Sequence, residues 1–180
     1  MVTVRHVPSE GLGAEEVSAL ERLFDEAWTH KGSLFTATDL RNAFGGLHFL
    51  VEEDGTIVAH GSVITRELRV GDLPLHTGYV EAVATRPSHQ RRGLGTAVMR
   101  AIDDHLDSAF ELGGLDTGFP DFYEPFGWFV WPGPTFVRMD RVVEATPDED
   151  GSVLVRRTPS TPELDLMLPL TCDWRPGDLW

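Results

Sequence analysis

Residues 80–99 read VEAVATRPSHQRRGLGTAVM, and this stretch decides the fold. Its first residues form an apolar run, which predicts a strand ending near Thr85. A loop with glycines at 93 and 95 follows, and apolar residues then recur at helical spacing from Leu94 onward. Successive backbone N–H groups of such a loop point into one concavity at the positive end of the helix, which suits a phosphate. The spacing alone also fits an ordinary tight turn between a strand and a helix.

The residues before this stretch predict a strand, two helices and two pairs of strands. The apolar residues of 14–28 recur every three or four positions, which indicates an amphipathic helix. Asp54-Gly55 suits a tight hairpin turn, so its flanking strands should be antiparallel. The expected elements are a strand at 3–7, a helix at 14–28, a short helix capped by Thr36 or Thr38 and stopped by Gly45-Gly46, strands at 48–52 and 56–65, and strands at 66–70 and 75–85 joined by a turn at 71–74.

The residues after the stretch continue the alternation of helix and sheet. They predict a strand at 112–118, a helical turn at 121–126, two strands within 127–139 broken at 132–134, and an exposed loop at 144–151. The final segment carries Trp174 and Trp180, and a tail this aromatic should be docked on the protein. We therefore expect one α/β (α+β) domain over residues 1–180, with a mixed, largely antiparallel sheet flanked by helices.

The balance of acidic and basic residues limits the classes of molecule that the protein is expected to bind. The 180 residues include 15 basic and 29 acidic side chains, giving a net charge of −14, and Lys31 is the only lysine. Such a chain repels nucleic acid and anionic membranes and favours cationic partners. Neither a signal peptide nor a membrane span is expected, and a lone Cys172 fits a reducing cytoplasm. The seven histidines show no metal-ligand spacing, so we expect no metal site.

The stretch at 80–99 resembles the acetyl-CoA signature of the GNAT N-acetyltransferases, in which a strand, the pattern Q/R-x-x-G-x-G/A and a helix follow one another. Further blocks resemble the aminoglycoside 2′-N-acetyltransferases within that family, in the same order from about residue 35 onward. These blocks are FTATDLRNAFGGLH, GYVEAVA, FYEPFGW, WPGPT, TPDEDG and CDWRPGDLW. The resemblance implies a GNAT fold with splayed central strands that hold acetyl-CoA, and a homodimer.

The resemblance also implies where the co-substrate binds. The strand before the loop would hold the pantetheine arm through the backbone of Ala82, Val83 and Ala84. The loop would hold the pyrophosphate, through Gln90, Arg91, Arg92, Gly93, Leu94, Gly95 and Thr96.

Two residues match the family's catalytic positions. Glu81 corresponds to the acid that accepts the ammonium proton, through a water. Tyr123 corresponds to the general acid beside the thioester sulfur, and a phenol with a reference pKa of about 10 keeps its proton at neutral pH. Taken without the resemblance, Glu81 reads as an exposed strand glutamate and Tyr123 as a packed aromatic residue.

An aminoglycoside carries several ammonium groups, so its pocket should be lined by carboxylates. The resemblance assigns this role to Asp39, Glu81, Asp116, Glu149 or Asp150, Asp178 and the α-carboxylate of Trp180, and thus includes residues 163–180 in the pocket. Where the family has an acid before the FTATD block, this chain has Leu34. That departure leaves open a GNAT enzyme acting on another cation, such as a polyamine, a cell-envelope amino sugar or a peptide amine. A module that binds coenzyme A without catalysis is a third reading, which the presence of Glu81 and Tyr123 disfavours.

Overall fold

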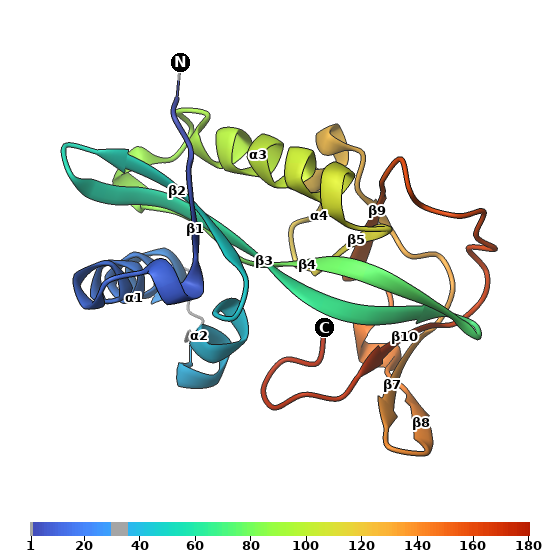
Figure 1. The fold of residues 1–180 in the computed structure, drawn as a ribbon. Helices are drawn as coiled ribbons and strands as arrows, with labels where there is room; N and C mark the ends of the chain where they lie inside the picture. The colour runs from blue at the N-terminus through green and yellow to red at the C-terminus, as the bar shows by residue number, and fades with distance from the viewer. Residues whose placement is uncertain (1, 30–35) are drawn as a thin grey trace. The chain divides into compact units, whose positions relative to one another are not determined.

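The computed structural model describes residues 2–29 and 36–180 (Figure 1). The helices are α1 (Ala14–Thr29), α2 (Ala37–Ala43), α3 (Leu94–Ala109) and α4 (Pro120–Tyr123). The strands are β1 (Arg5–Pro8), β2 (Leu47–Glu53), β3 (Thr56–Val70), β4 (Leu73–Thr85), β5 (Leu112–Asp116), β6 (Phe129–Val130), β7 (Thr135–Met139), β8 (Val142–Ala145), β9 (Val153–Arg157) and β10 (Leu170–Asp173).

The chain divides into two compact units, each with its own packing. Unit 1 comprises Met1–Ile64 and Val80–Asp104, and unit 2 comprises Thr65–Tyr79 and His105–Trp180. Strands β3 and β4 and helix α3 each contribute residues to both units. A single domain over residues 1–180 stays a prediction.

Unit 1 is built on an antiparallel hairpin. β1 pairs with β2, and β2 pairs with β3 across the predicted turn, where Asp54 and Gly55 both have positive φ, at 50° and 73°. The faces of β3 alternate: the His60 ring contacts Phe24 of α1, whereas Gly61 faces Val98 and Ile102 of α3. Helices α1 and α3 therefore cover opposite faces of this hairpin (Figure 1).

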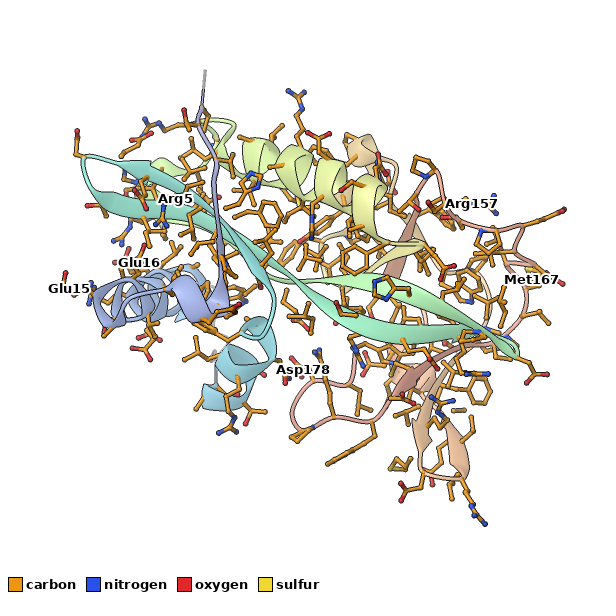
Figure 2. All side chains as sticks on the ribbon, in the orientation of Figure 1. Arg5, Glu15, Glu16, Arg157, Met167 and Asp178 are labelled. Carbon is orange, nitrogen blue, oxygen red and sulfur yellow. The ribbon has the colours of Figure 1, made fainter. Side chains whose placement is uncertain are left out.

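The helices of unit 1 begin and pack as the sequence pattern predicts. Leu20, Leu23 and Phe24 of α1 are fully buried against the sheet. Thr36 caps α2 by accepting a hydrogen bond from the Asp39 amide, while the Asp39 carboxylate accepts one from the Thr36 amide. Arg5 of β1 forms an ion pair with Glu16 of α1, and Figure 2 labels both residues.

Unit 2 holds the remaining strands around the ends of β3 and β4. β5 pairs in parallel with β4 and antiparallel with β9, which also pairs with β6. On the other side, β10 pairs antiparallel with β3 and in parallel with β7, and β8 forms the edge beyond β7. Most of these pairings are antiparallel, so the predicted class of sheet is confirmed.

The structure corrects the sequence predictions in four respects. Residues 66–70 are not a separate strand, because no turn residue interrupts ITREL and β3 runs unbroken to Val70. The acidic stretch at 144–151 was expected to be a loop, but β8 extends to Ala145 before a short 3-10 turn, Pro147–Glu149. Strands β8, β9 and β10 were not predicted. The docked tail is confirmed for Trp180, which is buried, and is wrong for Trp174, which is 54% exposed.

Among the described residues, no helix is long and apolar enough to span a membrane.

Candidate active site

The strand that precedes the glycine loop leaves its parallel partner before the predicted catalytic residue. β4 pairs with β5 at Thr77, Gly78 and Tyr79, opposite Leu112, Gly113 and Gly114. β4 then continues to Thr85 and β5 to Asp116, beyond the last pair. Glu81 and the residues expected to bind pantetheine therefore lie on the part of β4 that follows this pairing.

β4 bends at Ala82, immediately after Glu81. Ala82 has a φ of 51°, in the left-handed region. A residue with a Cβ is less stable in this conformation by about 1 kcal/mol, because the Cβ approaches the backbone carbonyl oxygen. Two side chains of β3 hold the backbone here. His60 Nδ1 lies 2.8 Å from the Ala82 carbonyl oxygen, and the Ser62 hydroxyl donates to the Glu81 carbonyl oxygen at 3.3 Å. The bend is thus fixed from the neighbouring strand.

The loop at 90–96 has the backbone geometry of an anion cradle. Arg91 and Gly93 both have positive φ, at 60° and 80°, and Leu94 is buried where α3 begins. The Ala97 amide donates to the Gly93 carbonyl oxygen, so the amides of residues 94–96 precede the first i to i−4 bond of the helix. These donors suit a pyrophosphate, which is the anionic group that coenzyme A would present to the loop.

The polar side chains of this loop are largely engaged within unit 1. Arg92 forms an ion pair with Glu53 at 2.8 Å, and the Gln90 side-chain amide donates to the Thr85 carbonyl oxygen at 3.2 Å. Arg91 is exposed. The backbone amides, with Arg91, are therefore the groups best placed to meet a phosphate.

Tyr123 lies at the end of α4 in unit 2, packed against aromatic rings. Its ring contacts those of Phe122 and Trp128, and it is buried. Burial is the main cause of a strongly raised pKa for the phenol, and the negative charge of Asp116 adds to it, while a hydrogen bond with the Thr117 side chain opposes both. Tyr123 is therefore protonated at every physiological pH.

Acidic side chains gather around Glu149 in the same unit. Burial raises the pKa of Glu149, and the charges of Asp116, Asp178 and Asp148 raise it further. These residues come from the end of β5, from the turn before β9 and from the loop after β10, where Figure 2 labels Asp178. A group of carboxylates that repel one another is stabilised by a cationic ligand.

A family model described as an acetyltransferase (GNAT) domain matches residues 11–130. The chain belongs to the GNAT family of acetyltransferases. The curated aminoglycoside 2′-N-acetyltransferase of Mycolicibacterium fortuitum is 37% identical over 182 residues, which cover 99% of this chain and 92% of that protein. The resemblance inferred from the sequence is thus confirmed.

Solved GNAT structures share the fold of this acetyltransferase. The YhbS acetyltransferase of Escherichia coli, in complex with CoA, superposes with a TM-score of 0.65 at 12% identity, covering 97% of this chain and 89% of that one. A GNAT acetyltransferase of Brucella melitensis in complex with acetyl-CoA gives a TM-score of 0.58 at 15% identity, covering 92% and 95%. At these identities the likeness concerns the fold.

The remaining predicted substrate acids of this acetyltransferase have structural partners. Asp39 completes the cap of α2 through both Thr36 donors. The Asp150 carboxylate accepts hydrogen bonds from the Thr135 amide and hydroxyl, whereas Glu149 belongs to the acidic group. The Trp180 main-chain oxygen accepts a hydrogen bond from Arg175 at 3.1 Å. Leu34 lies outside the described residues.

Sequence reasoning missed the side chains that support the β4 backbone through hydrogen bonds. Ser9, His48 and His60 connect to Ala82 through hydrogen bonds, although none of them belongs to the acetyl-CoA signature. The sequence did contain one signal for them, because two histidines lie within strands that are otherwise strongly apolar. No group of metal-ligating side chains is found in the described part of the chain.

Proposed function

We propose that this GNAT acetyltransferase transfers an acetyl group from acetyl-CoA to the 2′-amine of aminoglycosides. The substrate class rests on the acidic group around Glu149, which favours a ligand carrying several ammonium groups. The extended similarity to an aminoglycoside 2′-N-acetyltransferase supports the same substrate and position. Asp116, Glu149 and Asp178 would hold the ammonium groups that do not react.

Acetyl-CoA is the proposed donor and supplies the acetyl group as a thioester. The amides at 94–96 and Arg91 would bind its pyrophosphate, and the backbone of Ala82–Ala84 would hold the pantetheine arm. Acetyl transfer forms the C–N bond as the C–S bond breaks, in a ternary complex without an acyl-enzyme. The buried Cys172 supports direct transfer, because burial raises the pKa of its thiol and disfavours a nucleophilic thiolate.

The amine nitrogen loses two protons in this reaction: one leaves the ammonium group before attack, and the second ends on the departing sulfur, which leaves coenzyme A as a thiol. Glu81 would accept the proton lost by the attacking ammonium group, through a water. Tyr123 would face the departing sulfur, where its raised pKa favours a hydrogen-bond donor over a group that releases its proton. A phenol that holds its proton so strongly stabilises the developing thiolate as a hydrogen-bond donor, with the proton shared in the transition state.

Three further properties belong to this proposal. The enzyme would act in the cytoplasm, as a homodimer, and modification of aminoglycosides would confer antibiotic resistance on its host. Partners that are nucleic acids or membranes are disfavoured by the charge of −14. No metal is required by the proposed chemistry.

A panel of amines tests the substrate class. Thiol release from acetyl-CoA is measured with an aminoglycoside, with a polyamine and with a peptide amine at matched ionic strength. The aminoglycoside should give the highest kcat/KM, and Glu149→Gln should raise its KM while leaving the KM for acetyl-CoA unchanged. Asp121→Asn, an exposed acid on α4, is the matched control. A higher kcat/KM with the polyamine or the peptide would overturn the proposal in favour of another cationic substrate.

A further inference from the structure

A buried chain of hydrogen bonds connects the N-terminal segment to the bend in β4. Ser9 Oγ lies 2.8 Å from His48 Nε2, and His48 Nδ1 lies 2.9 Å from His60 Nε2. His60 Nδ1 lies 2.8 Å from the Ala82 carbonyl oxygen. Both imidazoles are completely inaccessible to solvent, and all four residues belong to unit 1. We call Ser9, His48 and His60 the histidine relay.

The carbonyl end of the relay fixes the position of every proton in it. The Ala82 oxygen only accepts, so His60 Nδ1 must carry a hydrogen, and the Nε2 of a neutral His60 must accept. His48 Nδ1 must then donate, which leaves His48 Nε2 to accept from the Ser9 hydroxyl. Burial lowers the pKa of both histidines, to about 4 for His48 and about 3 for His60, so both are neutral.

The other end of the relay is anchored by backbone amides. Ser9 Oγ accepts hydrogen bonds from the amides of Gly45 and Gly46, at 2.8 and 3.2 Å. These donors occupy its lone pairs and leave its single hydrogen to be donated, to His48 Nε2 at 2.8 Å or to the Gly46 carbonyl oxygen at 3.1 Å. Both imidazoles therefore have one defined orientation between Ser9 and Ala82.

The relay is arranged for positioning and not for proton transfer. A proton wire needs an end group that can take up a proton and release it, and a peptide carbonyl cannot do so near neutral pH. The Ala82 carbonyl belongs instead to a strained residue whose φ of 51° requires support from its surroundings. Its peptide unit continues into the amide of Val83, on the segment proposed to hold pantetheine, and Glu81 precedes it.

We propose that the histidine relay is a positioning device that holds the Ala82 bend in the shape that binds acetyl-CoA. The inference rests on the proposed function for the identity of the ligand. It predicts that His60 influences binding of acetyl-CoA through the β4 backbone, without contact with the amine substrate.

Two variants of nearly equal shape separate positioning from a merely structural role. His60→Asn retains an N–H donor at the position of Nδ1, whereas His60→Leu has the same branching and no donor. Both variants remove His60 Nε2, which accepts the hydrogen bond from His48 Nδ1. Both should therefore lower the melting temperature to a similar extent. Only His60→Leu should raise the Kd for acetyl-CoA, by about tenfold, with the KM for the amine unchanged.

Amide hydrogen exchange of Glu81–Ala84 in the free protein provides a readout that does not depend on any substrate. His60→Leu should accelerate exchange there by about tenfold, and His60→Asn should retain the wild-type rates. Equal Kd values and equal exchange rates for the two variants would overturn the inference. If the wild-type protein acetylates no aminoglycoside, the proposed function fails, while the exchange rates and the Kd for acetyl-CoA still decide the role of the relay.

Discussion

Acid should destabilise this protein through its two buried histidines. Unfolded His48 and His60 have pKa values near 6.5, whereas burial lowers those of the folded protein to about 4 and about 3. Between the folded and unfolded pKa values, the unfolded state binds more protons than the folded state. These two groups therefore leave the free energy of unfolding undiminished above pH 6.5 and lower it as the pH drops below that value. At pH 5 each imidazole accounts for about 2 kcal/mol of lost stability, or about 4 kcal/mol together.

Urea unfolding between pH 5 and pH 8, followed by tryptophan fluorescence, measures this loss. Near pH 5 two extra protons bound on unfolding correspond to a slope of about 3 kcal/mol per pH unit. The double variant His48→Asn/His60→Asn lacks both titrating groups, so its unfolding free energy should depend on pH much less steeply. Equal slopes for the two proteins would refute the reasoning. So would an imidazole ¹⁵N titration in which either folded histidine takes up its proton near pH 6.5.

Three further predictions concern single residues. Gly46→Ala would place a Cβ in steric overlap with the Val63 carbonyl oxygen, so it should lower the unfolding free energy by about 3 kcal/mol or more, whereas Gly118→Ala, which meets no atom within 4 Å, should leave the melting temperature unchanged. Gly93→Ala meets no neighbour but keeps a φ of 80°, so it should cost about 1 kcal/mol in stability and raise the Kd for acetyl-CoA by calorimetry; an unchanged Kd would contradict the cradle. Tyr123→Phe should lower kcat by about 10²-fold in a thiol-release assay with the Kd for acetyl-CoA unchanged, and a loss of binding instead would argue for a packing role.

The parts of the fold that were predicted are those with local signals. The Asp54-Gly55 turn, the apolar face of α1 and the Thr36 cap are each determined by residues close in sequence, and the structure contains all three. β9 and β10 are short and obtain their hydrogen bonds from strands far away in the chain. Their pairing depends on tertiary context, which no local pattern records.

The candidate site likewise contains parts that local sequence predicts and parts that depend on distant strands. The glycine loop was predicted because its backbone needs glycine at a left-handed position, which Gly93 occupies. The different surroundings of Glu149 and Asp150 could not be distinguished from adjacent letters, since the Thr135 contact that engages Asp150 comes from another strand. The histidine relay joins Ser9 to Ala82 across three strands, and its members acquire their roles only once those strands pair.

A comparison of two matched aminoglycosides tests the central claim most directly. One carries a 2′-amine and the other a 2′-hydroxyl, and thiol release from acetyl-CoA is followed with mass spectrometry of the products. We predict rapid addition of a single acetyl group to the compound with the 2′-amine and none to its 2′-hydroxyl counterpart. Equal acetylation of both compounds would contradict the assigned position, and no turnover with either, despite measurable binding of acetyl-CoA, would contradict the assigned substrate.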